Sequence, residues 1–215
     1  MRRLIYTTLM LIICSPPVLG QDQSVGARIG GLGVGVDYSY RLSDRIAVRG
    51  GLNSWGLDFT DFEAGIEYDF SLDLDSVYVG VDFHPMKGPF RVSIGILRND
   101  NALHAIRTPT VPLTIGSSIY QPSDIGSLIG SVTFDRTAPL ASVGWDFRYE
   151  KKLGMTLELG IVDQGSPIIA LGATGLIASD PQFMQDVTQE RIELEDAFAD
   201  VDFYPYVMLG MAFRF

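Results

Sequence analysis

The sequence is poor in the residue types that build disulfides, metal sites and nucleophilic active sites. Among its 215 residues it holds one cysteine, Cys14, and two histidines, His84 and His104. Cys14 lies within an amino-terminal leader, so the mature chain is expected to have no disulfide. Two distant histidines without a cysteine make no zinc ligand set. We therefore expect neither a metal nor another cofactor.

Basic residues and long apolar runs are also scarce. Lysine and arginine total 16 against 26 acidic residues, which gives a formal net charge of −10. Phosphate binding needs a basic surface, so nucleic acid is not an expected partner. Beyond the leader, no apolar run approaches the roughly 20 residues of a transmembrane helix. The hydrophobic residues, 47% of the chain, instead recur with a strand-like period.

The amino terminus has the features of a secretory signal peptide. Two arginines precede an apolar run over residues 4–13, and small residues follow before a polar one. This order of basic, apolar and small residues predicts that residues 1–20 are removed and that residues 21–215 form one domain. Lipid attachment at Cys14 is a weaker alternative, because Ile13 is large where lipoprotein processing needs a small residue.

The end of the chain shows the clearest strand pattern. Five apolar residues occupy alternate positions and project to one face of a strand, while small or charged residues occupy the other: Val207, Leu209, Met211, Phe213 and Phe215. Six earlier segments repeat the alternation: Ile29–Leu42, Ile46–Asn53, Ser76–His84, Phe90–Ile96, Ala141–Tyr149 and Leu153–Val162. In the first of these, Leu32 is placed on the outward face. Glycines on the opposite faces would make room inside a narrow barrel.

Seven strands predict an eighth, because single-chain barrels in bacteria have an even number. One candidate is Ile168–Leu176. It would put the tight turns at 42–45, 85–89 and 150–152 outside the cell, whereas small barrels normally keep short turns in the periplasm. The other candidate lies near Gln21–Gly30, and Ile168–Leu176 then extends the sixth strand beyond the membrane. The second arrangement gathers the aromatic residues beside those turns into one girdle with the chain end: Tyr40, Phe83, Phe90, Phe147 and Phe215.

The remaining segments are predicted to lie outside the membrane. The alternation changes parity at Trp55, which indicates a bulge within Gly50–Ser54 or the exit of the strand from the bilayer. Asp61–Asp69 is interpreted as an acidic loop. The long stretch Asn99–Gly130 is interpreted as a connection that contains a small hairpin at Leu113–Tyr120.

An acidic amphipathic helix is predicted over Pro181–Ala199. Asp180 is a typical N-cap, and proline favours the first helical position. Apolar residues follow at helical spacing: Phe183, Val187, Leu194 and Phe198. The apolar stripe is expected to cap the barrel mouth or to pack on the long connection. A second hypothesis is contact with lipopolysaccharide, which would need bridging divalent cations because both partners are negative.

The inward faces of the strands hold charges of both signs: Asp37, Arg41, Arg49, Asp75, Asp82, Arg91, Asp146, Arg148, Glu158 and Arg214. An eight-stranded barrel is just wide enough for its own side chains. An unpaired buried charge is costly, so these groups are expected to pair with one another. A polar conduit is the alternative. His84 with Asp82 is too weak a motif for catalysis and is interpreted as part of the lumen filling.

The leader, the alternating strands and the terminal strand ending on Phe215 resemble the small outer-membrane β-barrel proteins of Gram-negative bacteria, the OmpA/OmpX/OmpW-like class. The resemblance implies an all-β fold in the outer membrane: an eight-stranded antiparallel transmembrane β-barrel with one extracellular helix at about 181–199. It also implies that the terminal strand engages the barrel-assembly machinery, and that membrane lipids and lipopolysaccharide are partners.

The functions implied by this class differ. The first hypothesis is a non-enzymatic envelope or surface-interaction protein, and the second is a narrow channel for small or hydrophobic solutes. A lipid-modifying enzyme is the least favoured, because the chain lacks the His-x-Ser arrangement that lipid A deacylases carry near the chain end.

Overall fold

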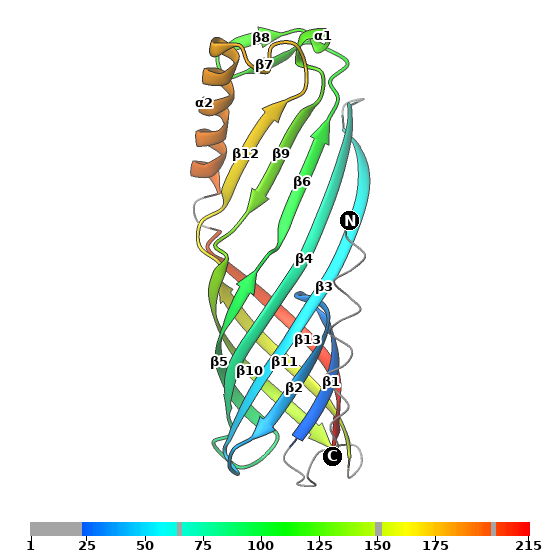
Figure 1. The fold of residues 1–215 in the computed structure, drawn as a ribbon, viewed down its shortest axis with the longest axis vertical. Helices are drawn as coiled ribbons and strands as arrows, with labels where there is room; N and C mark the ends of the chain where they lie inside the picture. Colours follow the sequence, from blue (N-terminus) through cyan, green and yellow to red (C-terminus); the bar gives the residue numbers. More distant parts are fainter. Residues whose placement is uncertain (1–22, 64–65, 149–151, 199–200) are drawn as a thin grey trace.

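The chain closes into an eight-stranded antiparallel barrel (Figure 1). The computed structural model describes residues 23–63, 66–148, 152–198 and 201–215. The barrel strands are β1 (Gln23–Gly30), β2 (Gly33–Arg41), β3 (Ile46–Glu63), β4 (Ile66–Phe83), β5 (Phe90–Asn99), β10 (Thr137–Arg148), β11 (Leu153–Asp163) and β13 (Phe203–Arg214). Each pairs with the next in this order, and β13 pairs back with β1. The predicted signal peptide, residues 1–20, lies outside the described residues.

Strand β1 is the eighth strand, so the candidate near Gln21–Gly30 is correct and Ile168–Leu176 is not a barrel strand. The segment predicted as one strand, Ile29–Leu42, is divided by a tight turn between β1 and β2. Gly33 follows this turn with φ of +97°, a backbone conformation that side chains disfavour. The reversal points Leu32 into the lumen, where it is 4% exposed, and its prediction as an outward residue is wrong.

The outer wall of the barrel is apolar. Fourteen of its exposed side chains form what we call the apolar belt: Val25, Ile29, Val34, Val36, Leu52, Val77, Val79, Ile94, Ile96, Leu159, Ile161, Val207, Leu209 and Met211. In water such a surface would be strongly unfavourable, whereas a barrel in lipid needs an outward apolar band. Every backbone group in the closed wall can pair with a neighbouring strand, which the hydrocarbon layer also requires. Among the described residues, no helix is long and apolar enough to cross a membrane.

The short turns lie at one end of the barrel, together with the carboxyl terminus. The backbone amide of Phe215 donates to the carbonyl of Gln23 at 3.2 Å, which places the chain end beside the start of β1. The β2–β3 and β4–β5 turns lie at this same end, opposite the end that carries the helices (Figure 1). The aromatic-girdle arrangement is therefore correct. The turn at 150–152 lies largely outside the described residues.

Beyond the barrel, β3 and β4 continue as one long hairpin. Their register is unbroken from Ile46↔Phe83 to Glu63↔Ile66, so no bulge interrupts Gly50–Ser54 and the strand simply leaves the barrel. The acidic loop predicted at Asp61–Asp69 is wrong, because the strands run to either side of residues 64–65.

Three short strands widen this hairpin into a sheet above the barrel. These are β6 (Ala102–Arg107), β9 (Leu128–Thr133) and β12 (Ile168–Ala173), which pair in the order β4–β6–β9–β12. Strand β12 therefore lies beyond the barrel but pairs with β9 instead of extending β11. The hairpin predicted within Leu113–Tyr120 is present as β7 (Leu113–Ile115) and β8 (Ser118–Tyr120), next to the one-turn helix α1 (Pro122–Ile125).

The predicted helix is present as α2 (Pro181–Ala197), and residue 199 lies outside the described residues. The Asp180 carboxylate caps its first turn by accepting from the backbone amides of Gln182 and Phe183, at 2.9 and 3.1 Å. Phe183 is buried among β7, α1 and neighbouring residues, with Val187 beside it, so the first half of the stripe packs on the long connection. Phe198, at the other end of the stripe, is 50% exposed.

The capping bond predicts the effect of Asp180→Ala. The substitution leaves two amides at the helix start without their acceptor and should cost about 1 kcal/mol of helix stability. We expect faster hydrogen exchange across α2 in the folded barrel. Asp196→Ala, at the opposite end of the helix, removes an equal charge without a capping bond and should leave the exchange rates unchanged. Equal acceleration in both variants would contradict the capping role.

Candidate functional site

A layer of charged side chains fills the barrel lumen, and Glu158 on β11 is at its centre. Its carboxylate accepts hydrogen bonds from Arg49 at 2.6 Å and from Arg91 at 2.8 Å. Ser142 and Tyr206 donate to its other oxygen at 3.0 and 2.8 Å. The carboxylate is thus surrounded by four donors from four strands.

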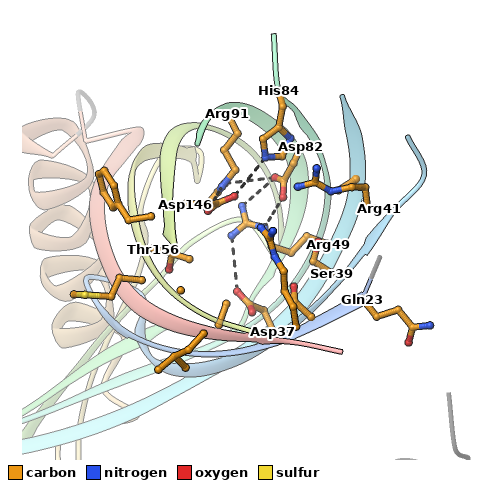
Figure 2. Close-up of a pocket in the computed structure, with 18 of the residues that line it drawn as sticks. Gln23, Asp37, Ser39, Arg41, Arg49, Asp82, His84, Arg91, Asp146 and Thr156 are labelled. Atoms are coloured by element: carbon orange, nitrogen blue, oxygen red, sulfur yellow. Dashed lines mark hydrogen bonds and ion pairs between the residues drawn. The ribbon is translucent and has the colours of Figure 1, made fainter. Parts of the chain in front are cut away.

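The two central arginines also bind the other carboxylates of the layer (Figure 2). Arg49 lies 3.1 Å from Asp82, and Arg91 lies 3.2 Å from Asp146. Ser93 donates to Asp82 at 2.6 Å. Strand β10 has a glycine beside this layer: a Cβ on Gly144 would lie 2.7 Å from the Arg91 guanidinium. The small residue at this position is what lets the guanidinium lie across the lumen.

The structure brings six of the predicted inward residues into this layer: Asp37, Arg49, Asp82, Arg91, Asp146 and Glu158. Arg41 and Arg214 lie nearer the carboxyl-terminal end, where they line a cavity of about 70 Å³ that also contacts His84. The side chain of Arg148 lies outside the described residues. Asp75 was assigned to the inward face in error, since the inward residues of β4 are even-numbered and Asp75 is exposed.

Sequence reasoning missed Arg28 as a member of the layer. Its guanidinium lies 3.9 Å from Asp37 and stacks at 4.2 Å over the Tyr78 ring. Its Nε donates to Asn53 at 3.2 Å. The signal was present as an alternation of Val25, Ala27 and Ile29 with small residues and Arg28.

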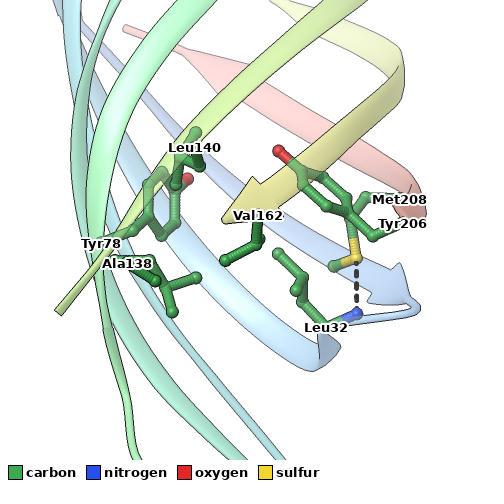
Figure 3. Close-up of a cluster of buried hydrophobic side chains, with 8 residues drawn as sticks. Leu32, Tyr78, Ala138, Leu140, Val162, Tyr206 and Met208 are labelled. Carbon is green, nitrogen blue, oxygen red and sulfur yellow. Dashed lines mark hydrogen bonds between the residues drawn. The ribbon is translucent and has the colours of Figure 1, made fainter. Parts of the chain in front are cut away.

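A second layer in the lumen is apolar, and Figure 3 shows its side chains. It lies next to the β1–β2 turn, farther from the carboxyl terminus than the charged layer. It consists of Leu32, Tyr78, Leu97, Ala138, Leu140, Val162, Tyr206 and Met208, each less than 9% exposed. The backbone amide of Leu32 lies 3.5 Å from the Met208 sulfur, which ties the β1–β2 turn to the neighbouring strand β13. Tyr78 and Tyr206 join the two layers: their rings pack in the apolar layer, and their hydroxyl groups donate to Asp37 and Glu158 of the charged layer.

The two histidines lie in different surroundings. His84 is buried in the lumen, with Nε2 3.4 Å from Asp146. It contacts this carboxylate rather than Asp82, the partner considered from the sequence. His104 is exposed on β6, beyond the barrel. Across the ranges that the structure describes, no group of three or more histidine, cysteine or acidic side chains has the geometry to hold a metal ion.

The second polar centre lies above the barrel, where α2 meets the β7–β8 hairpin. The buried Asp186 carboxylate accepts from the Tyr120 hydroxyl at 2.7 Å and from Ser117 at 3.3 Å. The Tyr120 ring meets Phe183 edge to face, with 5.1 Å between the ring centroids. The hydrogen bond from Tyr120 is the main cause that holds the pKa of Asp186 below its ordinary value. The ionised carboxylate therefore stabilises the docked helix.

Comparisons with known proteins agree with this geometry. No family model and no curated protein sequence matches the chain. Among solved structures, CarO2 of Acinetobacter baumannii is 19% identical, with a TM-score of 0.63 over 90% of this chain and 98% of that one. CarO of the same organism is 18% identical, with a TM-score of 0.61 over 89% and 97%.

The fold is that of a small outer-membrane β-barrel. The likeness extends over nearly the whole of both chains, and the apolar belt fits the hydrocarbon layer of the bacterial outer membrane, where this chain lies. At these identities the comparison speaks to the fold and leaves the activity to be argued from the site.

The contacts of Glu158 predict a large effect of Glu158→Gln. The amide keeps the volume but removes the charge that two buried arginines share, so the barrel should lose about 3–5 kcal/mol of unfolding free energy. Urea unfolding in lipid vesicles, followed by tryptophan fluorescence, measures this loss. The control is Asp44→Asn, which breaks a solvent-exposed ion pair with Lys87 and should leave the unfolding free energy nearly unchanged. A loss as small as that of the control would contradict the central role of Glu158.

The Asp186 site predicts a pH dependence. A carboxylate with a lowered pKa contributes its full stabilisation above the ordinary range, and loses it as the pH falls below about 4 and through the lowered pKa. Helix α2 should therefore undock on acidification while the barrel remains closed. Hydrogen exchange of α2, corrected for intrinsic rates, measures this between pH 6 and about 2. Asp186→Asn should show weaker docking at neutral pH and a smaller pH response.

Proposed function

We propose that the chain is a non-enzymatic, non-conducting barrel that holds a structured sheet and helix at the cell surface, in an envelope or surface-interaction role. The observation that carries this proposal is the double filling of the lumen. Above a layer of paired charges lies a layer of tightly packed apolar side chains. The burial of the apolar layer and the pairing of the described charges across the lumen favour a barrel that is closed to solutes.

The polar cavity near the carboxyl-terminal end does not alter this view. It has a volume of about 70 Å³, and Arg41, His84 and Asp146 also line a wider hollow of about 410 Å³ at the same end of the barrel. The apolar layer separates it from the surface end of the barrel. An ion that followed this route would lose its water at Leu97 and Val162 without gaining a partner.

The sheet above the barrel supports a surface-interaction role. This sheet is continuous with the wall of the barrel through the long β3–β4 hairpin, and β6, β9 and β12 extend it. Backbone hydrogen bonds therefore hold the sheet in place, rather than a flexible loop. Helix α2 packs on β12 and presents several acidic side chains to solvent. Rigid display of this kind lowers the entropy lost when a partner binds.

The placement of the histidines supports the non-enzymatic part of the proposal. His84 is 4% exposed and contacts the Asp146 carboxylate inside the lumen, which favours a lumen-filling role over a catalytic one. We further propose that β13, with its terminal Phe215, engages the barrel-assembly machinery, and that outer-membrane lipids and lipopolysaccharide surround the belt.

Planar-bilayer recording tests the closed lumen. The purified chain should give no reproducible conductance steps under voltage, whereas a wide general porin in the same bilayer gives them. Tyr78→Ala combined with Tyr206→Ala removes both rings that join the two layers and should introduce small steps. Reproducible steps from the unaltered chain would overturn the non-conducting proposal and favour the narrow channel.

A further inference from the structure

The inner face of the sheet above the barrel is apolar. On β3 and β4 the side chains that continue the lumen-facing parity are Trp55, Leu57, Phe59, Phe70, Leu72 and Leu74. Trp55 pairs across the strands with Leu74, and Leu57 pairs with Leu72. The opposite face of the same hairpin is polar, with Asp58, Ser71 and Asp73. This sheet therefore has one apolar face, although it lies above the barrel.

Part of this apolar face is exposed to solvent. Helix α2 and the β7–β8 hairpin cover it only at β9 and β12, around Phe183. Nearer the barrel, Trp55 is 47% exposed and Leu57 46%. These two residues, with Leu72 and Leu74, form the wall of a groove of about 360 Å³. That volume is within the roughly 300–1,000 Å³ of small-molecule sites.

The groove exists because β1 and β2 end earlier than the neighbouring strand β3. The pairing of β2 with β3 ends at Val34↔Ser54, so the edge of β3 is unpaired from Trp55 onward. The β1–β2 turn beneath it has glycines at positions 30, 31 and 33, which form the floor of the groove. The Tyr204 hydroxyl donates to the Gly31 carbonyl at 2.7 Å, and this bond satisfies a polar group that would otherwise face the groove.

The groove is continuous with the membrane-facing surface. Ile29 lines it and also belongs to the apolar belt, where it is 56% exposed. A hydrocarbon chain in the adjacent leaflet can therefore reach the groove over the β1–β2 turn without crossing a polar surface. Because the lining is almost wholly apolar and borders the apolar belt at Ile29, the fitting occupant is a flexible hydrocarbon chain rather than a polar solute.

We propose that this groove binds one acyl chain of a lipid from the adjacent leaflet, entering sideways over the β1–β2 turn. The chain lies against Trp55, Leu57, Leu72 and Leu74, and its headgroup stays at the membrane surface. The site does not use the lumen, so it is independent of whether the barrel conducts.

The two tryptophans of the sequence provide the test. In Trp145→Phe, fluorescence reports on Trp55 alone, and in Trp55→Phe it reports on Trp145 in the barrel wall. Each variant is reconstituted into vesicles that contain phosphatidylcholine brominated in mid-chain, a contact quencher. Although Trp55 lies beyond the membrane-crossing part of β3, we expect it to be quenched at least as strongly as Trp145, with saturation at low fractions of brominated lipid.

A matched pair of substitutions in the Trp145→Phe background separates the groove from general lipid contact. Leu57→Gln should weaken occupancy about tenfold, because an amide against hydrocarbon loses water without gaining a partner. Ile106→Gln changes a side chain of similar exposure, 43%, on the other face of the same sheet and should leave quenching unchanged. Both substitutions are at exposed positions, and heat-dependent gel mobility checks that the barrels are folded.

Three outcomes would overturn the proposal. The first is the absence of Trp55 quenching, and the second is an equal effect of the two glutamine substitutions. The third is quenching of Trp55 by free brominated fatty acid but not by brominated phospholipid, which would assign the groove to a soluble amphiphile instead of a membrane lipid.

Discussion

The pairing of Glu158 with Arg49 and Arg91 is the constraint on which the barrel depends. The three groups come from β11, β3 and β5, and each is almost wholly buried. In so narrow a lumen an unpaired charge would have no water to replace its partner. A slip of one residue in any of these strands would turn its charge toward lipid and its apolar side chains inward. The ion pairs therefore specify the register of the strands as well as filling the lumen.

The solvent around each part of the wall explains the distribution of polarity. Within the membrane, β3 presents Val48 and Leu52 outward and Arg49 and Asn53 inward. Above Ser54 the order reverses: Trp55 and Leu57 lie on the inner face and Asp58 on the outer. No bulge causes this reversal, because the register with β4 is continuous. The outer surface meets lipid below this point and water above it, so the apolar residues change faces although the backbone does not.

This reversal joins the two proposals made for the chain. Inside the barrel, polar filling and apolar packing leave the lumen closed. Above it, the same inner face becomes apolar and is only partly covered by α2 and the β7–β8 hairpin. A barrel that is closed along its axis can therefore still offer a hydrophobic site at its side, where the wall is lowest.

Much of the architecture was predictable because it depends on a local period. Alternation along single strands identified the barrel, its outer face and most of the charged layer, and Asp180-Pro181 located the start of α2. The same reasoning failed for Leu32, because a two-residue turn at Gly31 and Leu32 interrupts an alternation that is continuous in the sequence. It also missed β6 and β9, and it gave Ile168–Leu176 the wrong position, because β12 pairs with β9. A six-residue segment such as Ala102–Arg107 has no membrane period and forms a strand only because β4 extends beside it.

The sequence by itself determined which side chains share a face, since that follows from the geometry of one strand. It also determined that the outer face suits lipid and that the charges needed partners. Only the tertiary structure decided which charges meet, that β1 closes the ring, and that β12 lies outside it. These features depend on pairing between strands that are distant in the sequence. The residue pattern within one strand does not specify which other strand pairs along its edge.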